Sequence, residues 1–181
     1  MAGIFGGMQN ATVFGAGRNP VPGMYKLELT RLLHKPSANP KKKGHNLLIG
    51  EHSILEFTGT KWTSVENGKE TDTANAFKAG ESVSHVIDIS DAMYGLANTK
   101  EYMAAVWQAY STQVDGKPLT LDEALAFMST AEGESVAEDL VVGERSKKVK
   151  GLLLRLECWA ATKNGGAEDF TAKKYSALTE D

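Results

Sequence analysis

Apolar and polar residues alternate with period two near both ends of the chain. On the N-terminal side, the apolar positions of this alternation are Tyr25, Leu27, Leu29 and Leu33. On the C-terminal side, one set of positions holds Leu152, Leu154, Leu156 and Cys158, and the other holds Leu153, Arg155, Glu157 and Trp159. Period two is typical of strands with one buried face. We therefore predict a strand from about 24 to 35, ending near Pro36, and another from 152 to 159.

Further strands and turns are predicted between and after these two runs. A strand is expected over residues 46–58, with Gly50 as a bulge, and another over 83–89, with Val83, His85 and Ile87 on one face. Residues 66–69 read Glu-Asn-Gly-Lys, which favours a two-residue hairpin turn between short strands. A second Asn-Gly pair predicts a closing hairpin, whose last strand covers about 168–175.

Two helices are predicted between the strand at 83–89 and the strand at 152–159. Asn98 with Glu101, and Thr120 with Glu123, have the spacing of a capping box. Tyr102, Val106 and Tyr110 recur at every fourth position of the first helix, with Trp107 alongside, so we expect Tyr102 and Trp107 in the core.

The order of strands, helices and a closing hairpin predicts an α+β chain that is mainly β. A five-stranded Greek-key barrel with a helical insertion between strands three and four, plus an extra hairpin, fits this order. A sandwich with a helical insertion is the alternative. We expect a Gly-rich flexible arm at 1–22, one domain at 23–178 and a short acidic tail at 179–181.

The composition is that of a globular protein and argues against membrane, secreted and disulfide-rich proteins. Of 181 residues, 41% are hydrophobic and 24% are charged, as in globular proteins. No apolar run approaches the about 18 residues of a membrane helix, and the first residues lack the features of a secretory signal. Cys158 is the one cysteine, so an internal disulfide is impossible. We expect a cytoplasmic protein without a membrane partner.

The net charge is −3, but the charges are unevenly distributed. Acids concentrate between Asp115 and Asp139, bases between Arg145 and Arg155, and a second basic run is Lys41–Lys43. Screening limits the reach of exposed charges to roughly 8–10 Å, so an acidic chain can still present a basic surface.

Catalytic chemistry finds little support. The four histidines lack metal-ligand spacing, and no nucleophile elbow is present. Asp88 and Asp91 are expected to be turn and cap residues, and Cys158 a buried structural thiol. We predict a protein that is not an enzyme and uses neither cofactor nor metal; a catalytic site of dispersed residues is the alternative.

The closing hairpin instead favours binding of single-stranded nucleic acid, which needs cations for phosphates and aromatic faces for bases. Arg155 and Trp159 share a strand face, the basic loop at 145–150 leads into the same strand, and the loop at 41–43 joins the first two strands. The predicted contact residues are Lys35, Lys41, Lys42, Lys43, Trp62, Arg145, Lys147, Lys148, Lys150, Arg155, Trp159, Lys163, Lys173, Lys174 and Tyr175. The alternatives are that Trp159 covers an apolar patch under a helix, that the lysines are only solvated, and that Trp62 serves packing.

Three segments of the chain stand out together: Pro22-Gly-Met-Tyr-Lys-Leu-Glu-Leu, Gly44-His-Asn-Leu-Leu-Ile-Gly-Glu, and residues 151–170. They resemble segments of small phage-encoded single-stranded DNA-binding proteins with the oligonucleotide-binding (OB) fold. The resemblance is one of layout over about 22–60 and 83–175. It implies a protein that coats single strands in a bacterial host cell during replication or recombination.

The partners implied are single-stranded DNA, with RNA as the alternative, further copies of the chain and replication proteins. Such proteins often recruit partners through an acidic tail, whereas here the tail is only Glu180-Asp181. The alternative function is that of a phage structural or assembly protein, which uses the same β-rich domain for protein contacts.

Overall fold

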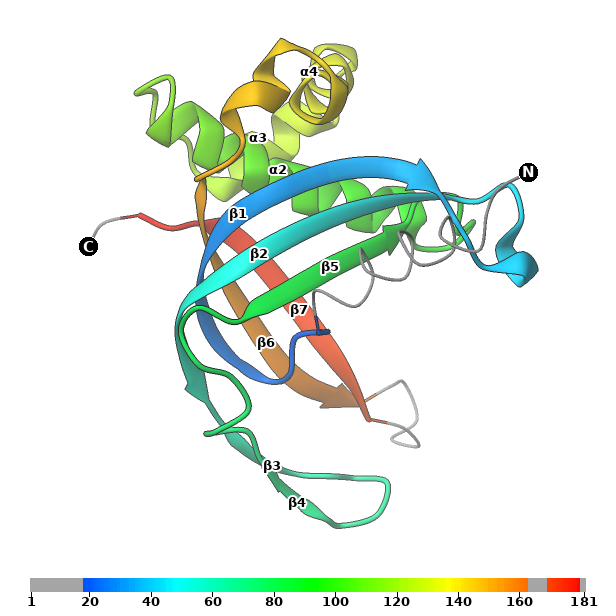
Figure 1. The fold of residues 1–181 in the computed structure, drawn as a ribbon, viewed down its shortest axis with the longest axis vertical. Helices are drawn as coiled ribbons and strands as arrows, with labels where there is room; N and C mark the ends of the chain where they lie inside the picture. Colours follow the sequence, from blue (N-terminus) through cyan, green and yellow to red (C-terminus); the bar gives the residue numbers. More distant parts are fainter. Residues whose placement is uncertain (1–17, 163–168, 180–181) are drawn as a thin grey trace, which may run out of the picture.

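Five antiparallel strands form the main sheet of the structure, a computed structural model that describes residues 18–162 and 169–179. The strands are β1 (Gly23–Pro36), β2 (Asn46–Gly59), β5 (Ser82–Asp88), β6 (Leu153–Thr162) and β7 (Asp169–Ala177). They lie in the order β5-β2-β1-β6-β7, so the first strand of the chain is the central one. The short strands β3 (Lys61–Thr63) and β4 (Glu70–Asp72) form a separate two-stranded hairpin at the lower end in Figure 1.

Three α-helices are inserted between β5 and β6 and gather at one end of the sheet (Figure 1). They are α2 (Gly95–Gln113), α3 (Leu121–Met128) and α4 (Ala131–Val142), and two short 3-10 helices are η1 (Pro40–Lys42) and η2 (Glu144–Lys148). The prediction of an α+β chain with its helices before the closing hairpin is thus confirmed. In the described part of the chain, each helix is too short or too polar to cross a membrane.

The sheet curls strongly, yet backbone hydrogen bonds do not close it into a barrel. Within the described residues, β5 and β7 are the two edges and do not pair with each other. Aromatic rings meet across this seam instead: the ring centroids of His85 on β5 and Tyr175 on β7 are 4.7 Å apart. The predicted barrel is therefore not closed: side chains, rather than a strand ladder, meet between the two edges.

The core lies between the inner face of the curled sheet and α2. The inner face contributes Tyr25, Leu27, Leu29, Leu154 and Leu156, which are all buried. Helix α2 buries Tyr102, Val106 and Tyr110 at spacings of four residues, which is the periodicity of one helix face. The expectation that Tyr102 is a core residue is confirmed, whereas Trp107 is half-buried against the other helices.

Two details of the core differ from the pattern. The register between β1 and β2 shifts between Leu29 and Arg31, which makes Thr30 an extra residue. Leu32 therefore faces the core and is 7% exposed, in place of the predicted Leu33. Gly50 pairs regularly with Leu32 and His85 and is not a bulge. A side chain at this position would collide with the hydroxyl of Tyr102, so the glycine makes room for that ring.

The helices also differ from their predicted limits. Helix α2 begins at Gly95 rather than after Asn98, because the Asp91 carboxylate already accepts hydrogen bonds from the backbone N–H groups of Met93 and Tyr94. Helix α4 was not expected. Its first turn is held by the Thr130 side chain, which accepts a hydrogen bond of 3.0 Å from the N–H of Gly133.

The capping box of α3 is confirmed and gives a test of the helical layer. The Glu123 N–H donates to the Thr120 hydroxyl at 3.2 Å, and the Thr120 N–H donates to the Glu123 carboxylate at 2.8 Å. Thr120→Ala is expected to lower the free energy of unfolding by about 1 kcal/mol, measured by urea unfolding. Ser135→Ala, an exposed position within α4, is the control and should change little. Equal midpoints for wild type and Thr120→Ala would contradict the prediction.

The prediction for the loop between β3 and β4 needs correction, and part of the predicted N-terminal arm is described. The β3–β4 connection spans residues 64–69 rather than two residues, since Ser64 N–H donates to Lys69 O across its base. The predicted arm at 1–22 ends in fixed structure: the Tyr25 hydroxyl donates to Val21 O at 2.6 Å, and Arg18 pairs with Glu81 at 3.2 Å. Residues 1–17 lie outside the described residues, as do residues 180–181 of the predicted tail.

Candidate nucleic-acid interface

The outer side of β1, β6 and β7 carries an exposed ring among cations. We call it the hairpin face and define it by Met24, Lys26, Arg155, Trp159 and Lys174. Trp159 and Met24 are each 44% exposed, Lys26 and Lys174 are exposed, and Arg155 is half-buried. The predicted alternation along β6 places Arg155 and Trp159 on this side, whereas the other set of residues is buried. The alternative in which a helix covers Trp159 is not what the structure has.

The register explains why the indole ring is accessible. Trp159 lies opposite Ala172 on β7, so the directly facing side chain is a methyl group. Lys174 lies two residues along from Ala172, on the same face, within the diagonal reach of a long side chain. A flat ligand such as a nucleobase can therefore approach the ring with a cation close by.

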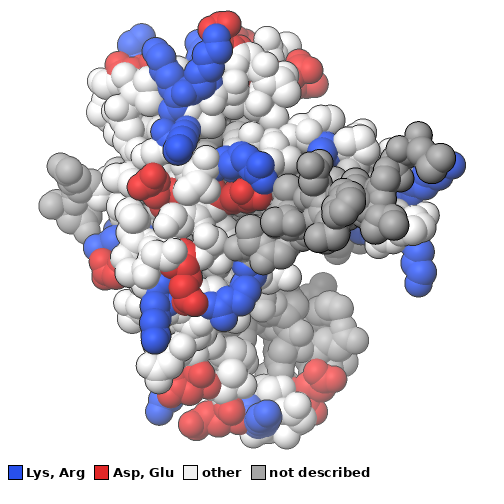
Figure 2. Space-filling model, in the orientation of Figure 1, with Lys and Arg blue, Asp and Glu red and all other residues white. Residues whose placement is uncertain are grey.

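The charge of the hairpin face is mixed rather than uniformly positive. Glu157 sits between Arg155 and Trp159 on β6 and lies directly opposite Lys174. Lys26 lies opposite Arg155 and pairs with Glu56 at 2.7 Å. Figure 2 likewise shows acidic and basic side chains interspersed over the sheet, with positive side chains gathered at the helical end and at the loop on the right. This face offers a few phosphate contacts, not a broad basic band.

Two predicted residues of the hairpin point inward. Lys173 pairs with Cys158 and Tyr175 with Leu156, so both lie on the inner side of the sheet. Tyr175 is 6% exposed and its ring contacts His52, His85 and Tyr102, so it is a core residue and cannot stack on a base. Burial lowers the pKa of Lys173 and raises the pKa of the Cys158 thiol to about 11, which agrees with a structural cysteine. Lys163 lies outside the described residues.

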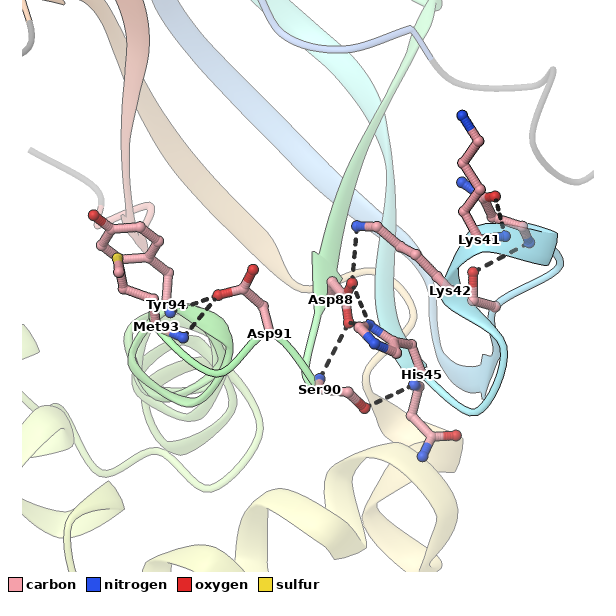
Figure 3. A network of polar contacts seen from close by, with 11 residues as sticks. Lys41, Lys42, His45, Asp88, Ser90, Asp91, Met93 and Tyr94 are labelled. Carbon is pink, nitrogen blue, oxygen red and sulfur yellow. Dashed lines mark hydrogen bonds and ion pairs between the residues drawn. The ribbon is translucent and has the colours of Figure 1, made fainter.

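The predicted basic loop between β1 and β2 is anchored to the end of β5. Figure 3 shows Asp88 between Lys42 and His45: Lys42 Nζ donates to Asp88 Oδ2 at 2.9 Å, and His45 Nδ1 lies 2.9 Å from the same oxygen. These two partners lower the pKa of the Asp88 carboxyl. The N–H of Asn46 also donates to the Ser90 hydroxyl at 3.0 Å. Asp88 and Asp91 are thus turn and cap residues, as expected.

The contact with Asp88 distinguishes Lys42 from the other two lysines of the loop. Lys42 is occupied by Asp88, so it holds the loop instead of offering a cation. Lys41 and Lys43 are exposed, and no acid among residues 18–162 and 169–179 forms an ion pair with either. Lys35 is half-buried near the end of β1. An open pocket of about 440 Å³ lies between the loop and β5, and its lining includes Leu47 and Val86.

The predicted cations at 145–150 lie at the helical end and serve partly as structure. Arg145 donates to Asp139 at 2.7 Å, which lowers the pKa of that carboxyl, and its guanidinium lies 5.8 Å from the centre of the Trp107 ring. Lys147 pairs with Glu144 at 2.9 Å. Lys148 and Lys150 are exposed. Trp62 is half-buried on the β3–β4 hairpin, opposite Thr71, so it belongs to a separate part of the molecule.

Met24 and Lys26 were not among the predicted contact residues, although they complete the hairpin face. They join it because β1 pairs with β6, more than a hundred residues later in the chain. The alternation at 24–29 does place both on the outer side of a strand, but local sequence does not show which strand lies alongside. Among the described residues, no three His, Cys, Asp or Glu side chains gather in a way that could hold a metal ion.

The comparisons with known proteins do not identify a family for this chain. No protein-family model matches the chain, and no curated protein is significantly similar to it.

Proposed function

We propose that this chain is a non-enzymatic single-stranded DNA-binding protein that contacts the strand through its hairpin face. One observation carries the proposal: Trp159 is exposed on a strand whose same face presents Arg155, with Lys174 beside it on the next strand. Base stacking on an aromatic ring, combined with phosphate contacts by cations, is the general mode of single-strand binding. Lys41 and Lys43 extend the cationic contacts at the other end of β1.

The arrangement of the strands supports the same proposal. Numbered along the chain, the five strands lie in the order third, second, first, fourth, fifth, with the helices between the third and the fourth. Joining the third to the fifth would give a five-stranded Greek-key barrel, and OB folds are barrels of this kind that are often partly open. The ring contact of 4.7 Å between His85 and Tyr175 brings these two strands together.

The segment resemblance extends the proposal to a biological setting. A phage-encoded protein of this kind would act in the host cytoplasm during replication or recombination, together with further copies of itself and replication proteins. RNA is the alternative ligand, since stacking on Trp159 does not depend on the sugar.

Titration with the oligonucleotide dT16 tests the proposal. We expect binding at low salt, followed by fluorescence anisotropy of a labelled oligonucleotide, and a fall of log K with log salt. With Arg155, Lys174, Lys41 and Lys43 as the contacts, the slope should be about −2 to −3, at about −0.7 per neutralised phosphate of a single strand.

Duplex DNA of the same length is the matched control and should bind more weakly, because its bases are not free to stack on Trp159. The absence of dT16 binding at low salt would reject the proposal. Equal affinity for duplex and single strand would show that only charge, and not the exposed ring, is used.

A further inference from the structure

The turn that leads from β5 into α2 exposes an unusual amount of apolar surface. Met93 is 75% exposed, Tyr94 61% and Leu96 74%, which makes them three of the most exposed large hydrophobic side chains among the described residues. Exposed single hydrophobic residues are ordinary, but neighbouring ones of this size usually mark a contact surface.

This turn is held firmly in place. The Asp91 carboxylate accepts hydrogen bonds from the N–H of Met93 at 3.0 Å and of Tyr94 at 2.8 Å. Gly95 is buried, and a side chain there would collide with the carbonyl groups of Asp88 and Ile89. The Tyr94 ring therefore projects from a fixed backbone, so little conformational entropy is lost when a ligand stacks on it.

The exposed ring and the exposed loop cations Lys41 and Lys43 lie at the same end of the sheet. Asp88 anchors the loop through Lys42 and is six residues before Tyr94, so the Cα atoms of Asp88 and Tyr94 are at most about 22 Å apart. Figure 3 shows Asp91 between Tyr94 and Asp88 in this view. Figure 3 places Tyr94 and Lys41 on opposite sides of Asp88 at the end of β5, so a strand that crosses this end can reach both a stacking surface and the cations of the loop.

We propose that Tyr94 is a second stacking platform for the same DNA strand, with phosphates contacted by Lys41 and Lys43. This inference rests on the proposed function. Trp159 adjoins the Gly23 end of β1, and the loop follows its Pro36 end. β1, which has 14 residues and follows a curved path of about 45 Å at about 3.3 Å per residue, thus runs between the two platforms. A long oligonucleotide can engage both platforms, whereas a very short one can engage only one.

The test compares dT16 with dT5 by anisotropy of labelled oligonucleotides. Tyr94→Ala is expected to weaken dT16 binding at least about fivefold, the lower end of the effect of losing one base–aromatic stack. It should leave dT5 binding at Trp159 unchanged. Tyr94→Phe keeps the ring and should restore dT16 affinity. Val142→Ala, which removes apolar surface from a side chain that is 70% exposed on α4, is the matched control and should bind as wild type.

Each other outcome overturns the inference. If wild type binds dT16 and Tyr94→Ala binds it equally well, Tyr94 is not a platform and only this inference falls. An equal loss for dT5 and dT16 would show a general effect on the fold. If Tyr94→Ala changes the sedimentation of the free protein but leaves its affinity for dT16 unchanged, the surface serves contacts between copies of the chain. If wild type binds neither oligonucleotide, the proposed function falls together with this inference.

Discussion

Lowering the pH from 7 to 5 is expected to remove about 2 kcal/mol of folding stability through His52 alone, with a further loss through His85. Both side chains belong to a ring cluster with Tyr102 and Tyr175 at the seam between β5 and β7. His52 is fully buried, and burial lowers its pKa to about 4. A difference of one unit between the folded-state and unfolded-state pKa corresponds to about 1.36 kcal/mol of stability.

Burial is the main reason why these rings resist protonation, and the hydrogen bonds show which neutral form His52 takes. His52 Nδ1 lies 3.3 Å from the carbonyl of Val83, which can only accept, so this nitrogen carries the proton of a neutral ring. His52 Nε2 then accepts from the Tyr102 hydroxyl at 2.8 Å. The His85 Nδ1 atom is sealed from solvent and has no hydrogen-bond partner among the described residues. Burial, together with the nearby Lys173 ammonium and His52, lowers the pKa of His85 well below its usual value.

The sign of the effect follows from these depressed values. An unfolded histidine takes up a proton near pH 6.5, whereas His52 in the folded state does so only near pH 4. Between these values the unfolded state binds more protons, so stability falls as the pH falls and is fully present only above about 6.5. Carboxylates with lowered pKa, such as Asp88 and Asp139, add their own losses at lower pH. Measurement between pH 7 and 5 therefore isolates the histidines.

His85→Phe is the informative variant. A phenyl ring keeps the contacts with Tyr102 and Tyr175 and removes the buried nitrogen that lacks a partner, so stability at pH 7 should be equal or higher. The dependence of unfolding free energy on pH should become clearly shallower, as measured by urea unfolding at several pH values. His34→Gln, at an exposed position, is the control and should keep the wild-type dependence. An unchanged slope in His85→Phe would refute this account.

Local patterns predicted which face of a strand is buried far better than where register changes. The alternation along Leu152–Trp159, and that of Val83, His85 and Ile87, correctly separates inner from outer residues. The alternation in β1 fails after Leu29, because the extra residue Thr30 turns Leu32 inward. Such an insertion depends on the partner strand, so no local signal in β1 reveals it. Gly50 suggested a bulge. A glycine is instead required there because a side chain would collide with the hydroxyl of Tyr102, which lies on a helix fifty residues away.

The residues of the candidate site could likewise be predicted only where alternation within one strand decides which face they occupy. Arg155 and Trp159 follow from alternation within one strand. Lys173 and Tyr175 were included because a hairpin brings them near, but nearness does not decide the face. The register does: Cys158 lies opposite Lys173, so the odd-numbered residues of β7 turn inward and Lys174 turns outward. A shift by one residue would reverse every one of these side chains, and the turn that sets the register is not specified by the strand pattern.

Trp159→Ala is expected to weaken binding of dT16 by about 1–3 kcal/mol, or roughly 5- to 150-fold, because one base loses its stacking partner. The fold should tolerate the change, since the side chain is 44% exposed and faces only Ala172 across the strand pair. Anisotropy of labelled dT16 measures the affinity, and urea unfolding checks that stability is retained. Glu157→Gln is a matched change on the same face: it removes the acid beside Arg155 and should strengthen binding at low salt.

Fluorescence then locates the contact among the three tryptophans of the chain. Trp107 is stacked between Tyr110 and Phe127 in the helical layer, with ring centroids 5.8 and 5.5 Å away, so it should not report on a strand bound at the hairpin face. Trp159→Phe keeps a stacking ring and should retain most of the affinity, while the quenching seen on binding to wild type should largely vanish. Quenching that persists in Trp159→Phe, with affinity unaffected in Trp159→Ala, would move the contact to Trp62 on the β3–β4 hairpin. The hairpin face would then have no part in binding, since its remaining cations are offset by Glu157 and Glu56 and offer no surface on which a base can stack.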